Sequence, residues 1–188
     1  MSFENTLNSL TPEQRDIVVK LPYRAGLFIS ESDNSGGDSA NDDERRTLEN
    51  IIYGFADGVF GSELIQYIMS EIINRRAEWG QWDQNLDNVL QEAHDAMEIL
   101  SAYVDQKECS AFTVRIMEIA EAVALAFREQ ENLTHIEHLR LYLSYLSHRA
   151  RARALKMPYR NFNDFLSISP AERVALSQMA QALKTQYI

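Results

Sequence analysis

This sequence has few basic residues, a single cysteine and no long apolar run. Each of these features excludes a class of structure or of binding partner. The single Cys109 has no second cysteine to pair with, so we expect no disulfide, and a reducing compartment suits the chain. No apolar run approaches the roughly 18 residues that a membrane-spanning helix needs, so we expect no membrane insertion. Residues 1–14 lack a basic region followed by an apolar stretch, so we expect no signal peptide and a cytoplasmic protein.

The balance of charge is acidic. Eighteen Lys and Arg stand against 28 Asp and Glu, which gives a formal net charge of −10. Binding to a phosphate backbone needs a positive surface, so we expect no nucleic-acid partner. The acidic net charge suits a protein that binds cations or a basic protein partner. A homo-oligomer is compatible with this sequence as well. Gly-x-Ser-x-Gly, Walker and GxGxxG motifs are absent, which disfavours the enzyme classes that use them.

The periodicity of apolar residues predicts an all-α protein. No segment alternates apolar and polar residues with the β-branched enrichment of strands, so we expect no sheet. Apolar residues instead recur at intervals of three and four, which is typical of amphipathic helices. Thr11 and Ser169 open two capping-box signatures at helix starts. The pattern predicts helices over 12–20, 22–31, 42–58, 62–78, 84–104, 108–129, 135–153 and 170–185.

Short connections between these helices predict a single-domain antiparallel bundle of seven or eight helices. The segment 108–129 is apolar nearly all round, so we expect it at the centre of the bundle. The layout also suggests two related helical halves, over about 12–78 and 84–153, followed by the C-terminal helix. No segment has the composition of a linker between domains.

The main clue to function is the acidic segment 31–44, with the sequence ESDNSGGDSANDDE. It holds six carboxylates and no Lys or Arg in fourteen residues. Such carboxylates repel one another unless a cation neutralises them, and Ca²⁺ or Mg²⁺ takes oxygen ligands from loops of this kind. Asp33 to Glu44 has the twelve-residue length of an EF-hand loop, although Asp38 stands where that loop has its glycine. The alternative is a solvated loop with helix-capping acids.

A similar layout recurs in the second half of the chain. Glu131 precedes Glu137 by six residues after the apolar segment 122–127, as Asp38 precedes Glu44 by six after an apolar helix. The recurrence indicates either an internal duplication or two unrelated helix–turn–helix units, because helix starts favour acidic residues in any case.

This layout resembles the TerB-like family associated with bacterial tellurite resistance. The matching residues are Leu27-Phe28-Ile29-Ser30-Glu31 with Asp43-Glu44, and Ala124-Leu125-Ala126-Phe127 with Glu131 and Glu137. The Asp-Gly pair of the family is absent, and the nearest match is Gly37-Asp38. The resemblance implies a small non-enzymatic helical module, active in stress response or as an interaction scaffold, with acidic turns that bind Ca²⁺ or Mg²⁺. The expected ligands are Asp33, Asp38, Glu44, Glu131 and Glu137.

An enzymatic alternative uses a second set of carboxylates. Glu92 with Asp95, and Glu118 with Glu121, are each three residues apart, so each pair shares a helix face. Facing each other, the pairs would hold Mg²⁺ over a diphosphate. This resembles the helical nucleoside triphosphate pyrophosphohydrolases, although the two motifs stand in reversed order here. The alternative is that the four side chains face solvent and pair along their own helices.

The basic tract 148–156 stands out in an acidic chain. Arg149 and Arg153 share a helix face and would dock an acidic partner or a phosphate-bearing ligand. Alternatively, these basic side chains form ion pairs with carboxylates of the same molecule, or they interact with the partial negative charge of a helix C-terminus. A third class of function is an acidic adaptor or immunity-type protein that covers a basic partner without binding metal.

Overall fold

The computed structural model describes residues 9–32, 38–57, 62–126 and 170–185, together with Leu146 and Arg149. This part of the chain contains no strand, which confirms the all-α class. Within it, no helix combines the length and the apolar character that crossing a bilayer requires. The α-helices are α2 (Pro12–Ser30), α3 (Asp38–Asp57), α4 (Glu63–Asn74), α5 (Trp79–Trp82), α6 (Val89–Tyr103), α7 (Gln106–Ala126) and α9 (Pro170–Ala182), and the short 3-10 helices are η1 (Arg76–Glu78) and η2 (Leu86–Asn88).

Helix α2 runs without a break through Pro22, whereas the sequence predicted two helices separated at this proline. A proline inside a helix removes a backbone hydrogen bond and costs about 3 kcal/mol. Burial outweighs that cost, because ten of the 19 residues of α2, Pro22 among them, are buried. The predicted capping box is present, and the Thr11 hydroxyl accepts a hydrogen bond from the Gln14 amide at 3.2 Å.

Other boundaries also differ from the predicted ones. Helix α3 begins at Asp38 rather than at residue 42. The predicted helix 62–78 divides into α4 and η1, and the predicted helix 84–104 divides into η2 and α6. Asn85 precedes η2 with a φ of 56°, a left-handed conformation that asparagine tolerates better than most residues. The predicted helix 135–153 lies outside the described residues, apart from Leu146 and Arg149.

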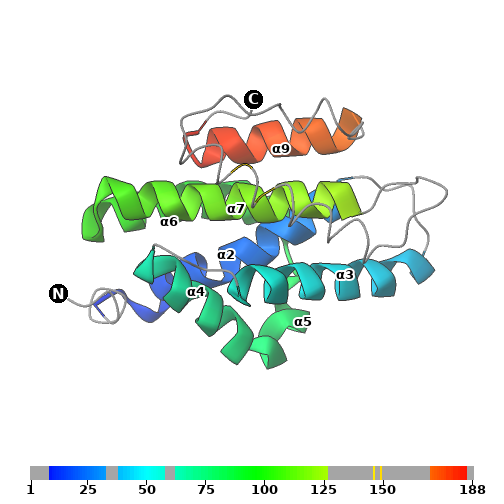
Figure 1. Ribbon diagram of the computed structural model, residues 1–188, viewed down its shortest axis with the longest axis horizontal. Helices are drawn as coiled ribbons and strands as arrows, with labels where there is room; N and C mark the ends of the chain where they lie inside the picture. Colours follow the sequence, from blue (N-terminus) through cyan, green and yellow to red (C-terminus); the bar gives the residue numbers. More distant parts are fainter. Residues whose placement is uncertain are drawn as a thin grey trace.

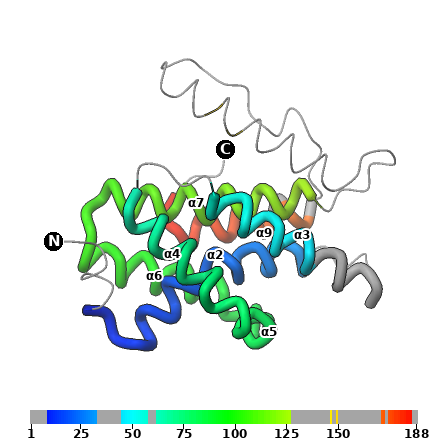
Figure 2. The backbone as a smooth tube through the Cα atoms, turned by 60° about the horizontal axis from the view of Figure 1, so that its bottom comes forward, coloured from blue at the N-terminus to red at the C-terminus, as the bar shows by residue number. Residues whose placement is uncertain are grey.

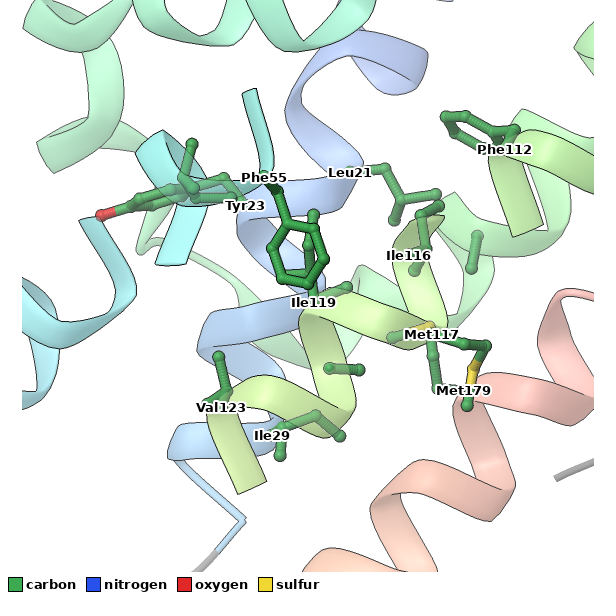
Figure 3. Packing of buried hydrophobic residues seen from close by; sticks show 14 of the residues in the cluster. Leu21, Tyr23, Ile29, Phe55, Phe112, Ile116, Met117, Ile119, Val123 and Met179 are labelled. Atoms are coloured by element: carbon green, nitrogen blue, oxygen red, sulfur yellow. The ribbon is translucent and has the colours of Figure 1, made fainter. Parts of the chain in front are cut away.

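Helix α7 occupies the middle of the molecule, between α9 on one side and α3 on the other (Figure 1). Thirteen of its 21 residues are buried, as its nearly all-round apolar sequence predicted. Met117 of α7 lies against Met179 of α9, and Val123 lies beside Ile29 of α2 (Figure 3). One continuous core therefore joins the N-terminal, central and C-terminal helices.

Gly26 permits close approach between α2 and its two neighbours. A Cβ atom at this position would lie 2.4 Å from Leu48 Cδ1 of α3 and 3.3 Å from Val123 Cγ2 of α7. Both distances are shorter than an ordinary van der Waals contact, which needs about 3.5 Å between carbon atoms. Glycine therefore lets the C-terminal halves of α2 and α7 lie side by side with α3.

These contacts bring several helix ends to the same end of the molecule. The C-terminal ends of α2 and α7 and the N-terminal ends of α3 and α9 lie toward that end (Figure 1). We call this end the acidic pole, and we define it by residues 27–32, 38–44 and 121–126. The acidic segment 31–44 and the segment that follows Ala126 both begin at this pole.

Candidate functional site

The structure describes part of the first acidic segment. Glu31 ends α2, where its amide donates to the Leu27 carbonyl at 2.9 Å, and the Ser32 hydroxyl donates to the Ile29 carbonyl at 2.7 Å. Asp38 and Glu44 lie on α3, and the structure describes only their backbone. Asp33, Glu131 and Glu137 lie outside the described residues.

Residues 38–44 are helical, so they do not have the loop conformation of the last seven positions of an EF-hand loop. The prediction of an EF-hand-like loop is wrong for residues 38–44. The physical reason is that carboxylates in the first turns of a helix interact favourably with its positive N-terminal end. Asp38 and Glu44, six residues apart, lie about 120° apart around the axis of α3. A site that uses both of them would therefore need ligands from another segment.

The helix ends at the acidic pole carry acidic residues and few basic ones in their terminal turns. Neither α2 nor α7 has a basic residue in its last turn. The N-terminal ends of α3 and α9 carry partial positive charge, but acidic residues occupy them, including Glu172 in the first turn of α9.

The four carboxylates of the enzymatic alternative have other partners. Glu92 accepts a hydrogen bond from Arg24 Nε at 2.6 Å, and Asp95 accepts one from Gln91 Nε2 at 2.7 Å. Glu118 lies 3.6 Å from Arg115 on the same helix, and Glu121 lies 3.8 Å from Arg149. Among the described residues, no three metal-ligating side chains come together, so these carboxylates do not form the predicted cluster.

The basic tract is partly visible. Arg149, which the sequence assigned to partner binding, forms an ion pair with Glu121 inside the molecule. Leu146 packs against the hydrophobic core. Arg153 lies outside the described residues.

The sequence analysis missed a buried arginine that organises the region around α5. Arg24 is 3% exposed and lies within the apolar face of α2. Its Nη1 donates to the Trp82 carbonyl and, at 2.8 Å, to the Gln84 carbonyl, and its Nη2 donates to the Asn85 carbonyl at 2.9 Å. Together with the bond to Glu92, this guanidinium fixes the turn between α5 and η2 to helix α2. A charged residue inside an apolar run was the signal in the sequence.

A second charge cluster joins α2 to the end of α4. Arg75 binds Asp16 and Glu78, and its guanidinium lies 5.2 Å from the centre of the Trp82 ring. Burial raises the pKa of Asp16, but the hydrogen bond and charge of Arg75, together with Lys20, outweigh burial and hold that pKa below 3.8. The hydrogen bond from Arg75 likewise holds the pKa of Glu78 below 4.5.

Tyr23 lies beside both tryptophans and is fully buried. Its ring centre is 4.7 Å from that of Trp79 and 5.7 Å from that of Trp82. Burial raises the pKa of Tyr23 to about 12, and within the described part of the chain its hydroxyl has no hydrogen-bond partner. The hydroxyl therefore contributes little to stability.

Glu108 is a buried carboxylate at the start of α7, at the end of that helix away from the acidic pole. The Ser62 hydroxyl donates to its Oε2 at 2.5 Å, and the same Ser62 oxygen accepts from the Ile65 amide at 3.1 Å. One serine thus caps α4 and satisfies a buried charge. Burial raises the pKa of the neighbouring Cys109 thiol, which makes it a poor nucleophile.

The buried charge contacts are accordingly structural, and the acidic pole is the strongest candidate for binding. Comparisons of the chain with protein-family models, with curated proteins and with solved structures found no match.

Proposed function

We propose that this protein is a non-enzymatic, cytoplasmic helical module of the TerB-like type, which binds a divalent cation at its acidic pole. The ion is a hard cation, Ca²⁺ or Mg²⁺, because the candidate ligands are carboxylates. The candidate ligands are Asp33, Asp38, Glu44, Glu131 and Glu137. In such a module, the cation joins the two acidic segments and so controls the surface that the pole offers to a protein partner.

One observation carries this proposal. The C-terminal ends of α2 and α7, from which the two acidic segments start, lie at the same end of the molecule (Figures 1 and 2). The neighbours of Gly26, which are Leu48 and Val123, bring these ends together independently of any acidic residue. Two acidic segments that start side by side repel each other, and a shared cation removes that repulsion.

The same observation supports the predicted relation between two helical halves. In each half, a buried helix ends at the acidic pole and is followed by an acidic segment. We include in the proposal the antiparallel bundle, which the short connections predict, and the two related halves, which the family resemblance implies.

Isothermal titration calorimetry tests the proposal. The wild-type chain is titrated with Ca²⁺, Mg²⁺, Mn²⁺ and Zn²⁺, and the variant Asp38→Asn/Glu44→Gln is titrated under the same conditions. We expect saturable binding of Ca²⁺ or Mg²⁺ to the wild type, weakened at least about tenfold in the variant because two charged ligands are lost. The absence of binding by all four cations would contradict the proposal.

The control variant is Asp87→Asn/Glu98→Gln, which removes two negative charges from exposed positions on η2 and α6. Its net charge equals that of the test variant, so any general effect of protein charge appears in both. We expect the control to bind the cation as tightly as the wild type. Equal weakening in both variants would indicate non-specific attraction rather than a site at the pole.

A second candidate function is the acidic adaptor that covers a basic protein partner. The pairing of basic side chains favours it, because internal ion pairs take up positive charge and leave the acidic surplus for the surface. The basic residues in such pairs are Arg15, Lys20, Arg24, Arg45, Arg75, Arg76, Arg115 and Arg149. Salt-sensitive binding of a lysine-rich peptide, unchanged by divalent cations and by chelators, would favour this function over the first.

A further inference from the structure

Residues 76–88 connect α4 to α6 and lie at the outer edge of the helix assembly, around α5 (Figures 1 and 2). We call this segment the strap. It consists of η1, α5 and η2, and none of these three helices has a side-chain cap. A Cβ atom added at the exposed Gly80 would have no neighbour within 4 Å in the described part of the chain, so this side of the strap is uncovered.

The backbone of the strap makes only local hydrogen bonds. The Glu78 amide donates to the Arg75 carbonyl at 2.8 Å, and the Asn88 amide donates to the Asn85 carbonyl at 3.1 Å. Within the described residues, no backbone hydrogen bond joins the strap to α2, α3 or α7. Helices of three or four residues are unstable on their own, so tertiary contacts have to hold the strap in place.

Side chains provide the contacts that join the strap to the long helices. The Arg24 guanidinium of α2 donates to the carbonyls of residues 82, 84 and 85. Trp79 Nε1 donates to the Ile72 carbonyl of α4 at 2.9 Å, and Arg76 forms an ion pair with Glu49 of α3 at 2.9 Å. A small number of side chains therefore decides whether the strap stays closed.

The strap buries little surface in comparison with the helices beneath it. The buried residues of its three helices are Trp79 and Trp82, whereas α2 buries ten residues and α7 buries thirteen. The free energy of a local opening rises with the apolar area that it exposes. Release of the strap therefore costs less than separation of the long helices. Asn85, with its φ of 56°, adds backbone strain to the closed form.

We infer that the strap opens as a unit while the long helices stay folded, so the protein has a closed and an open conformation that differ in this segment. In the closed form, both tryptophans lie against the Tyr23 ring, and three carbonyls of the strap occupy donors of Arg24. Opening exposes that ring and those donors to solvent. This conformational change is independent of the proposed cation site.

Urea unfolding followed by two signals tests the inference. The two tryptophans of the sequence are both in the strap, so tryptophan fluorescence reports the strap, while far-ultraviolet circular dichroism reports the long helices. We expect the midpoint of the fluorescence transition at a lower urea concentration than the midpoint of the dichroism transition. The free energy of the fluorescence transition should also depend less steeply on urea, because opening exposes less surface than unfolding.

The variant Asn85→Val acts on the strap alone. Asn85 is exposed, and its positive φ is one that a β-branched residue adopts only with strain. We expect the equilibrium constant for opening to rise roughly five- to a hundredfold, which lowers the fluorescence midpoint and leaves the dichroism midpoint unchanged. The matched control is Asn50→Val at an exposed position on α3, where valine and asparagine have similar helix propensities and both midpoints should stay unchanged.

Ser62→Ala gives the opposite pattern. Ser62 caps α4 and binds Glu108 of α7, and both contacts remain when the strap opens. We therefore expect this variant to lower the dichroism midpoint and to leave the fluorescence midpoint unchanged. Midpoints that coincide in the wild type, or that fall together in Asn85→Val, overturn the inference, because the strap then unfolds only with the long helices.

Discussion

Replacement of the buried Arg24 by glutamine tests how the fold is held together. Arg24 donates four hydrogen bonds, three of them to the backbone carbonyls of residues 82, 84 and 85 and one to Glu92. Glutamine cannot reach this set of acceptors, so the variant leaves the partly buried Glu92 carboxylate with Lys20, 3.6 Å away, as its remaining partner, and it leaves several backbone carbonyls without their donor. Loss of one member of a buried ion pair costs about 3–5 kcal/mol.

That loss is large on the scale of the whole protein. Domains have a free energy of unfolding of about 5–15 kcal/mol. For a chain of this length, each kcal/mol lowers Tm by roughly 2–4 °C, so we expect Arg24→Gln to melt roughly 6–20 °C below the wild type. The free energy of unfolding is measured by urea titration, with fluorescence from Trp79 and Trp82, which are buried at 3% and 5% exposure.

The control is Arg76→Gln. Arg76 also binds a carboxylate, Glu49 at 2.9 Å, but its side chain is 59% exposed. Exposed pairs of this kind contribute less than about 1 kcal/mol. If both variants lost the same free energy of unfolding, Arg24 would not be the residue that holds the α5–η2 turn against α2. Arg24→Lys adds a second check, because it keeps the charge and loses the planar fork of donors.

The remaining predictions concern single contacts in the core and on α2. Ser62→Ala removes the cap of α4 and the hydrogen bond to Glu108, so we expect a loss of about 1–3 kcal/mol in urea unfolding, against less than about 0.5 kcal/mol for the exposed Ser101→Ala. Tyr23→Phe removes a buried hydroxyl that has no partner in the described part of the chain, so stability should stay unchanged or rise by up to about 1 kcal/mol. Because burial raises the pKa of Tyr23 to about 12, ionisation of its phenol opposes folding, so the wild type should lose stability relative to Tyr23→Phe as the pH rises from 10 toward 12, which urea unfolding of both proteins at alkaline pH will measure. The pKa of Asp16 is lowered, so its ion pair with Arg75 stabilises the fold above pH 3.8, and that stabilisation is lost as the pH falls further. At neutral pH we expect Asp16→Asn to be less stable than the wild type by less than about 1 kcal/mol. In acid-unfolding curves this difference should shrink below pH 3.8.

The helical architecture was predictable because it depends on local patterns. Apolar spacing and caps are encoded within a few residues, and the start of α2 at Thr11 follows the predicted capping box. The prediction at Pro22 was wrong because the cost of a proline is local, whereas the burial that outweighs it comes from helices far along the chain. The segment 108–129 was predicted to lie at the centre of the bundle, and the burial of most of α7 confirms this placement.

The candidate site was less predictable, because charged residues find partners across the fold. Arg24 meets Glu92, 68 residues away, and no spacing rule relates the two. That contact removes Glu92 from the carboxylate cluster that its spacing from Asp95 had suggested. The acidic segments were visible in composition, but their common origin at one pole depends on the packing around Gly26.

The stoichiometry of Ca²⁺ binding tests the central claim most directly. Equilibrium titration of the wild type, of Asp38→Asn, of Glu131→Gln and of the double variant compares one carboxylate from each acidic segment. We predict one ion per chain, at least about tenfold weaker binding in either single variant, and a double variant whose loss differs from the sum of the two. Two independent ions per chain, or full affinity in either single variant, would contradict a shared cation at the acidic pole.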